Sequence, residues 1–257
     1  MMRRLAIAAF ASLSIAVAIP SPASAQATGS NDAVLKELQA IHELLKQLVV
    51  QTAPAPQQQP PAAQEPPKTA KLDSVRGYFL GRLDAPVTMV EFTDLQCPYC
   101  KMFHEFVFDK LKREYIDTGK VRFITRDNAL PMHAYAPIAA MSSRCAGEQG
   151  KFWEVRRALQ LNADKLDLAL IKNTARDNGV EMTAYQQCMD SEKFLTDITE
   201  DGKAATAAGF TGTPAFVIGR TAANGVEGEV ISGAQSWPTF EAALKALLDA
   251  APSAKTK

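Results

Sequence analysis

Two cysteines separated by two residues are the strongest chemical feature of this sequence. Cys97 and Cys100 follow the mostly apolar, β-prone residues 87–92 and precede residues 101–115, where apolar side chains recur at helical spacing. The pair therefore lies where a strand leads into a helix. Backbone N–H groups at a helix start lack partners within the helix, and the helix dipole is positive there. We expect this position to stabilise a thiolate at Cys97 and to make Cys97 the more acidic thiol.

The residues around the pair favour thiol–disulfide exchange. Pro98 suits the first helical position, because its missing N–H is no loss there and its φ angle is already helical. Cys100 then falls on the first turn, within reach of Cys97, and Lys101 adds a nearby positive charge. A lowered pKa would make Cys97 both a nucleophile and a good leaving group. The segment therefore predicts a redox-active pair.

A structural disulfide and a metal site are the alternatives for these cysteines. A zinc site needs two further Cys or His ligands at similar spacing, whereas Cys145 and Cys188 are single residues far downstream. A soft metal such as Cu(I) could still bind Cys97, Cys100 and His104. Redox catalysis is the preferred interpretation, because Cys-x-x-Cys before a helix in a βαβ pattern is typical of redox motifs.

The first 25 residues have the features of a secretory signal peptide. A basic segment, 1–4, precedes an apolar run, 5–19, and Ala23-Ser24-Ala25 matches a cleavage site. The apolar run is shorter than the ~20 residues that span a bilayer. We therefore expect a mature chain from residue 26 in an oxidising compartment, the periplasm. The 28 basic and 28 acidic residues balance, and no basic run has interleaved aromatics, which argues against a nucleic-acid partner.

Residues 26–52 are expected to form an oligomerisation helix. Apolar residues there alternate steps of four and three, as in a coiled coil, at Val34, Leu38, Ile41, Leu45 and Leu48. Flanking positions are also apolar, at Leu35, Leu44 and Val49. This broad face favours a trimer or larger bundle over a dimer. A helix folded back on its own catalytic domain is the alternative, since fewer than three heptads are present.

The remaining boundaries follow from composition. Residues 53–71 are rich in Pro and Gln and predict a semi-rigid linker, extended by ~3.1 Å per residue where it is polyproline. Residues 72–250 are long enough for one sizeable core. Strands are expected at 87–92, 121–125, 215–219 and 229–232, with a last helix at 238–248. We expect residues 251–257 to form a disordered tail.

Three segments of this domain resemble the DsbA family of thioredoxin-fold oxidoreductases: Phe92–Cys100 (FTDLQCPYC), Ala146–Trp153 (AGEQGKFW) and Gly212–Phe216 (GTPAF). They occur in the family's order within roughly residues 75–250. The resemblance implies an α/β fold, with a thioredoxin-like core and an inserted helical domain at about 129–208. It implies no cofactor.

The resemblance also implies roles for residues around the cysteines. In the family the Thr213–Pro214 bond is cis and lies beside the redox pair. A proline is tolerated as the first residue of a strand, where no ladder donor is lost. The backbone of Thr213 would pair with an extended substrate, which Pro98 and Tyr99 would also contact.

Glu91 and the two distant cysteines complete the candidate site residues. In relatives an acid six residues before the nucleophile relays protons to or from the second cysteine, and burial favours the neutral form of such a group. A solvated or ion-paired Glu91 is the alternative. Cys145 and Cys188 are expected to form a structural disulfide, worth up to ~4 kcal/mol in the chain-entropy model, with two free buried thiols as the alternative.

The sequence therefore predicts a periplasmic thiol-disulfide oxidoreductase that forms or reshuffles disulfides in secreted proteins. Pro98 and Tyr99 do not determine the direction of the reaction. The expected partners are unfolded or misoxidised secreted proteins and a membrane redox partner, either a DsbB-like oxidase or a DsbD-like reductase. The N-terminal helix resembles that of trimeric ScsC-like members, which favours a homotrimer and isomerase activity. The alternative function is copper or other soft-metal relay through the same cysteines.

Overall fold

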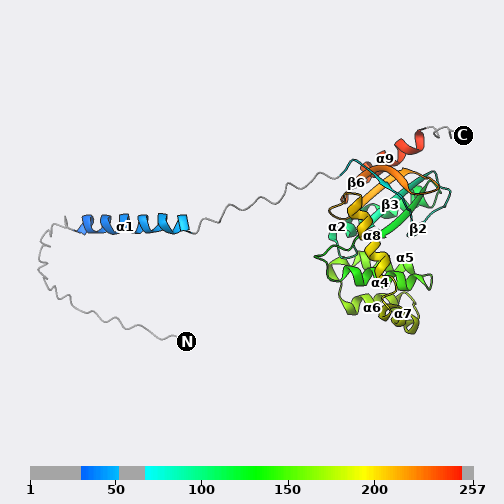
Figure 1. Ribbon diagram of the computed structural model, residues 1–257, viewed down its shortest axis with the longest axis horizontal. Helices are drawn as coiled ribbons and strands as arrows, with labels where there is room; N and C mark the ends of the chain where they lie inside the picture. Colours follow the sequence, from blue (N-terminus) through cyan, green and yellow to red (C-terminus); the bar gives the residue numbers. More distant parts are fainter. Residues whose placement is uncertain (1–29, 52–66, 251–257) are drawn as a thin grey trace, which may run out of the picture. The chain divides into compact units, whose positions relative to one another are not determined.

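The computed structural model describes residues 30–51 and 67–250, which belong to two units divided near residue 62 (Figure 1). The expected signal peptide, most of the expected linker and the expected tail lie outside the described residues. Within the described part of the chain, no helix is both long and apolar enough to cross a membrane.

The described residues of the first unit form the helix α1 (Ser30–Gln51). Its apolar side chains are 51 to 62% exposed, at Val34, Leu35, Leu38, Ile41, Leu44 and Leu45. An isolated helix of this length is marginal in water unless its apolar face is covered.

A six-stranded sheet forms the centre of the second unit, in the order β1-β6-β5-β3-β4-β2. Its strands are β1 (Thr69–Leu72), β2 (Tyr78–Leu80), β3 (Val87–Thr93), β4 (Val121–Asp127), β5 (Ala215–Arg220) and β6 (Val226–Ser232). β3 and β4 are parallel, and every other pairing is antiparallel. The sheet confirms the predicted α/β, thioredoxin-like fold.

Helices cover both faces of the sheet. On one face α2 (Pro98–Phe106), α3 (Phe108–Leu111), the π-helix η1 (Lys112–Ile116) and α9 (Trp237–Asp249) surround a cluster of aromatic rings. Phe103 lies in this cluster, with ring centroids 4.6 Å from Phe216 and 5.3 Å from Phe240. Strand β3 is covered on both faces: all seven of its residues are buried, and four of them are apolar.

A helical group is inserted between β4 and β5. It contains α4 (Ala136–Gly147), α5 (Phe152–Leu161), the short 3₁₀ turn η2 (Ala163–Lys165), α6 (Leu168–Asp177), α7 (Met182–Asp190) and α8 (Leu195–Ala207). These helices form a second core, which Leu95 from the active-site loop enters. Figure 1 shows α4, α6 and α7 grouped on the side of the sheet opposite α9.

Buried ion pairs attach the helical group to the sheet. Arg144 of α4 donates to Asp127 of β4 at 2.8 Å and to Asp201 of α8 at 2.7 Å. Asp201 also accepts from Arg126 of β4 at 2.8 Å, and Arg156 of α5 lies 2.8 Å from Asp127. A charge removed from such a cluster would leave its partner buried and unpaired.

Two boundaries differ from the sequence-based expectations. Three of the four residues of β1, 69–71, fall in the segment 53–71 for which a linker is expected; they form a strand because their backbone pairs with β6, more than 150 residues later. The continuous helix expected over 101–115 is interrupted at Val107 and continues as α3 and a π-helix. β2 was not predicted, since its three residues are too few for a periodic pattern.

Candidate active site

The loop between β3 and α2 holds both cysteines at the start of a helix. Cys97 is the residue that caps α2, with φ −77° and ψ 124°, and Pro98 is the first helical residue. Both sulfurs are free thiols, and both residues are buried, with 3% of Cys97 and 0% of Cys100 exposed. The backbone N–H of Asp94 points at the Cys100 sulfur, 3.5 Å away.

The surroundings lower the pKa of the Cys97 thiol to about 6. The largest cause is a hydrogen bond from the Cys100 thiol, which outweighs the opposing effect of burial. The side chain of Thr213 and the backbone N–H groups of Cys100 and Tyr99 lower it further. The backbone N–H groups at the helix start therefore lower the pKa of Cys97, as expected, but by less than the Cys100 thiol does.

Lys101 does not have the role that its position suggested. Its ammonium group pairs with Asp164 of η2 at 2.5 Å and lies 3.9 Å from Glu105. It is not among the main causes of the lowered pKa of Cys97. Although Lys101 is next to Cys100 in the sequence, its charge pairs with a carboxylate of the helical insertion.

Cys100 has the opposite electrostatic environment. Burial raises its pKa well above the usual thiol value, and the hydrogen bond to Cys97 and the charges of Cys97 and Glu91 raise it further. At neutral pH the pair therefore contains one thiolate, at Cys97, and one protonated thiol, at Cys100. This asymmetry makes Cys97 the better nucleophile of the two at neutral pH.

The Thr213–Pro214 peptide bond is cis and lies next to the redox pair. The Cys97 thiol is 3.4 Å from the carbonyl oxygen of Thr213. Pro214 immediately precedes β5, so the missing N–H costs the sheet no ladder bond. The Thr213 hydroxyl is buried and has no oxygen or nitrogen partner among the described residues, which leaves it free to donate to the Cys97 thiolate.

Glu91 lies in the middle of β3 and is completely buried, so it is not a solvated edge residue. Its carboxylate oxygens lie 3.1 and 3.4 Å from Nε2 of His104, on α2, and accept from the Thr125 hydroxyl at 3.3 Å. Its nitrogen partner is therefore a histidine. Its charge acts on Cys100, as the raised pKa of that thiol indicates.

The metal alternative placed His104 with the two cysteines. Nε2 of His104 instead faces Glu91. Among the described residues, no group of three or more His, Cys, Asp or Glu side chains is arranged to hold a metal ion. The geometry gives no support to a Cys97–Cys100–His104 copper site.

An apolar surface borders the cysteines. Tyr99, Met102 and Phe106 of α2 are 60, 43 and 73% exposed, and their spacing of three and four residues places them on one side of the helix. Pro98 is exposed at the start of the same helix. Large apolar side chains grouped in this way are typical of a surface that binds other polypeptides.

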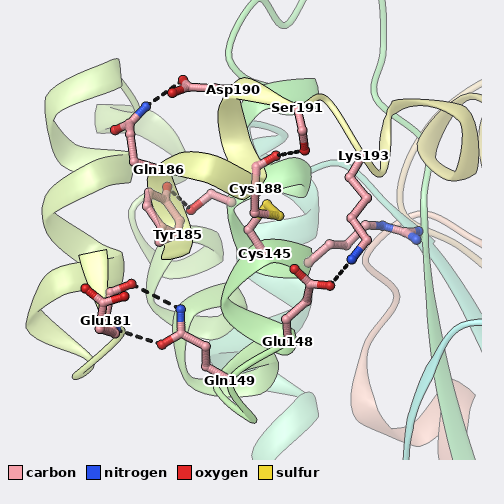
Figure 2. The surroundings of a disulfide bond; sticks show 12 residues. Cys145, Glu148, Gln149, Glu181, Tyr185, Gln186, Cys188, Asp190, Ser191 and Lys193 are labelled. Atoms are coloured by element: carbon pink, nitrogen blue, oxygen red, sulfur yellow. Dashed lines mark hydrogen bonds and ion pairs between the residues drawn. A yellow bond between two sulfur atoms is a disulfide. The ribbon is translucent and has the colours of Figure 1, made fainter. Parts of the chain in front are cut away.

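Cys145 and Cys188 are joined by a disulfide between α4 and α7, with an S–S distance of 1.98 Å. Figure 2 shows polar contacts on both sides of the bond: Glu148 pairs with Lys193, and Gln149 bonds with Glu181. The bond lies within the helical group, which indicates a structural position.

Asp94 is a site residue that sequence reasoning missed. One carboxylate oxygen accepts from the backbone N–H of Gln96 at 2.7 Å, and the other accepts from Leu130 at 2.7 Å and lies 2.8 Å from Nδ1 of His133. These bonds tie the cysteine loop to the loop after β4. An Asp just before a tight turn was the available clue, because such residues often bond the backbone two positions on.

Comparisons with known proteins agree with this geometry. The family model described as Thioredoxin matches residues 73–246. A Rickettsia felis protein named as a protein-disulfide oxidoreductase is 29% identical over 184 residues, which are 69% of this chain and 63% of that protein. This chain thus spans less than two thirds of that relative's length.

Solved structures show the same fold. Alpha-DsbA1 of Wolbachia pipientis is 29% identical with a TM-score of 0.61, over 66% of this chain and 90% of that chain. BdbD of Bacillus subtilis is 23% identical with a TM-score of 0.58, over 70% of this chain and 100% of that chain, and supports the fold alone. The chain belongs to the thioredoxin family, within its DsbA-like branch.

Proposed function

We propose that this chain is a periplasmic thiol-disulfide oxidoreductase that forms or reshuffles disulfides in secreted proteins through Cys97 and Cys100. One observation supports the proposal most strongly: a thiol with a pKa of about 6 lies beside a buried thiol with a raised pKa. The first is a good nucleophile and leaving group at neutral pH, and the second holds its proton until it is needed.

The two thiols support exchange in both directions. In the oxidising direction, a substrate thiolate attacks the Cys97 sulfur of the disulfide, Cys100 leaves as a thiolate, and a second substrate thiolate then releases the reduced enzyme. In the reshuffling direction, the Cys97 thiolate attacks a substrate disulfide and expels one substrate thiolate. If the substrate does not rearrange, the Cys100 thiol attacks the Cys97 sulfur of the mixed disulfide and releases the substrate as a thiolate. Both routes proceed through a mixed disulfide at Cys97.

Substrate binding is assigned to the surface around Cys97. The backbone of Thr213 lies beside the sulfur, where an extended peptide can pair with it as an added strand. The exposed face formed by Tyr99, Met102 and Phe106 suits the apolar side chains of an unfolded chain. Unfolded or misoxidised secreted proteins are therefore the proposed substrates, and a DsbB-like oxidase or DsbD-like reductase is the proposed membrane partner.

The N-terminal residues set location and assembly in this proposal. Residues 1–25 direct export, and α1 joins the chains into a homo-oligomer, with a trimer favoured. The exposed apolar face of α1 supports assembly, because a helix of this length needs a partner to be stable. Several active sites on one assembly raise the effective concentration of a second site near a trapped substrate, which favours reshuffling.

Refolding of a scrambled-disulfide substrate tests both parts of the proposal in the mature chain. The wild type is compared with a Leu38→Lys, Leu45→Lys variant, which places charges on the apolar face of α1. A Gln39→Lys, Gln47→Lys variant adds the same charges elsewhere on that helix. Light scattering gives the assembly state of each, and Cys97→Ser measures the uncatalysed background.

We expect the wild type and the glutamine variant to be oligomeric and to refold the substrate. The leucine variant should be monomeric and lose isomerase activity, while its exchange with a small dithiol stays unchanged. Equal refolding by all three α1 forms would contradict the role of the helix. Refolding by Cys97→Ser at the wild-type rate would contradict the disulfide chemistry itself.

A further inference from the structure

The peptide unit between Thr93 and Asp94 faces the buried sulfur of the redox pair. Its N–H belongs to Asp94, which directly follows the last residue of β3, and it points at the Cys100 sulfur, 3.5 Å away. Cys100 is completely buried. The backbone N–H therefore takes the place that a water molecule would have as a hydrogen-bond donor beside an exposed thiol.

The loop from Asn128 to His133, just after β4, holds this peptide unit at both ends. The carbonyl oxygen of Thr93, in the same peptide unit, accepts from the backbone N–H of Asn128 at 2.9 Å. On the other side, one carboxylate oxygen of Asp94 accepts from the backbone N–H of Leu130 at 2.7 Å and lies 2.8 Å from Nδ1 of His133. The direction of the Asp94 N–H therefore depends on contacts with this loop.

The remaining polar atoms of Asp94 bind the cysteine loop itself. The second carboxylate oxygen accepts from the backbone N–H of Gln96 at 2.7 Å. The carbonyl oxygen accepts from the backbone N–H of Cys97 at 3.1 Å and from the side-chain amide of Gln160 at 3.3 Å. Asp94 thus connects the loop after β4 to both cysteines, and a shift of its carboxylate would move the N–H that faces Cys100.

We propose that His133 is a positioning residue for disulfide exchange: through Asp94, it holds the backbone N–H that donates to the Cys100 sulfur when this sulfur is a thiolate. The inference rests on the proposed disulfide chemistry. A buried thiolate without a donor is costly, and a hydrogen bond to a charged sulfur is stronger than one to a neutral thiol. The N–H therefore stabilises Cys100 most where Cys100 carries negative charge.

The step that forms this thiolate balances in atoms and electrons. A substrate thiolate attacks the Cys97 sulfur of the enzyme disulfide, and a bond forms between the substrate sulfur and Cys97. The Cys97–Cys100 bond breaks, and Cys100 leaves with the electron pair as a thiolate. The substrate sulfur is oxidised and Cys100 is reduced, and the thiolate then takes one proton from water. Resolution of the mixed disulfide is the reverse step, in which Cys100 attacks as a thiolate after giving up that proton.

The other groups around Cys100 oppose its ionisation. Burial, Cys97 and Glu91 all raise the pKa of the Cys100 thiol, whereas the backbone N–H of Asp94 lowers it. Negative charge develops on Cys100 in the transition state of both directions, and a fixed donor aimed at that charge stabilises the transition state. Displacement of the N–H should therefore slow both directions by the same factor and leave the equilibrium between them unchanged.

Variants of His133 in the full mature protein test the proposal. His133→Ala and His133→Leu remove the ring nitrogen that faces Asp94, and leucine also fills the space of the ring. Asparagine can place a side-chain N–H near the position of Nδ1, so His133→Asn is the conservative variant. Met132→Ala is the matched control, because Met132 lies in the same loop and is 76% exposed.

The assay separates the step of Cys97 from the step of Cys100. Each reduced protein is mixed with oxidised glutathione, and acid quench with mass spectrometry follows the mixed disulfide at Cys97 as it forms and as Cys100 resolves it. We expect His133→Ala and His133→Leu to slow resolution by about tenfold, the lower end for a hydrogen bond to a charged group, and to leave formation unchanged. His133→Asn and Met132→Ala should resolve the mixed disulfide at close to the wild-type rate.

The reduction potential, measured against a glutathione buffer, completes the test. In His133→Leu the attack of reduced glutathione on the oxidised protein should slow by the same factor as resolution, so that the potential equals that of the wild type. Unchanged resolution in His133→Leu, equal slowing of formation and resolution, a shifted potential, or no rescue in His133→Asn would each overturn the proposal. If the wild-type protein forms no mixed disulfide, the proposed function itself fails.

Discussion

The main cause of the low pKa of Cys97 can be tested with two variants of its neighbour. Cys100→Ala removes the S–H group that donates to the Cys97 thiolate, whereas Cys100→Ser replaces it by an O–H donor in the same place. A hydrogen bond to a charged group is worth about 1.5–3 kcal/mol, and one pH unit corresponds to about 1.36 kcal/mol. Cys100→Ala should therefore raise the pKa of Cys97 by about one to two pH units, and Cys100→Ser by much less.

Both variants leave Cys97 as the only free thiol, since Cys145 and Cys188 are bonded. The ultraviolet absorbance of the thiolate and the rate of alkylation by iodoacetamide, each followed against pH, give its pKa independently. An unchanged pKa in Cys100→Ala would refute the reasoning, because the helix start would then be sufficient alone. An equal rise in both variants would also refute it.

Three further predictions concern stability. The folded pKa of Cys97, about 6, lies below the usual thiol value of about 8.5, and one pH unit corresponds to about 1.36 kcal/mol. The thiolate therefore stabilises the reduced protein by about 3 kcal/mol above pH ~8.5, and this stabilisation is lost as the pH falls through about 6. Urea unfolding should therefore show reduced Cys97→Ser less stable than reduced wild type at pH ~8.5 and equal to it at pH ~5; a pH-independent difference would contradict this. Replacing Cys145 and Cys188 together by Ala should cost up to about 4 kcal/mol in the same assay, because their bond closes a 43-residue separation, and unchanged stability would contradict a structural role. Asp201→Ala should lower the free energy of unfolding by about 3–5 kcal/mol, because Arg126 and Arg144 would stay buried without this carboxylate. A decrease below about 1 kcal/mol would contradict this, because it would show that solvent replaces the carboxylate.

Local patterns predicted the central part of the fold well. Runs of apolar, β-prone residues predicted β3 and β5, which are almost entirely buried, and parts of β4 and β6, where polar residues such as Arg122 and Glu227 interrupt the pattern. β1 was hidden at the end of a Pro-rich segment, where only its pairing with β6 makes it a strand. A truncation that starts at Leu72 would thus remove most of an edge strand of the catalytic sheet.

The site was predictable where it depends on neighbouring residues and unpredictable where it depends on distant ones. The position of Cys97 at a helix start follows from the chain around it. Local spacing suggested that the charge of Lys101 acts on Cys97, whereas its ion-pair partner is Asp164, 63 residues away. The contact between Glu91 and His104 joins a strand to the next helix, so it appears only when that helix packs on the sheet.

Trapping of the mixed disulfide tests the central claim most directly. Reduced Cys100→Ala is mixed with a peptide that contains one disulfide, and mass spectrometry locates the bond between peptide and protein. The account predicts a stable mixed disulfide at Cys97 in this variant, rapid release of the reduced peptide by the wild type, and no adduct in Cys97→Ser. An absent adduct in Cys100→Ala, or peptide reduction by Cys97→Ser at the wild-type rate, would contradict it.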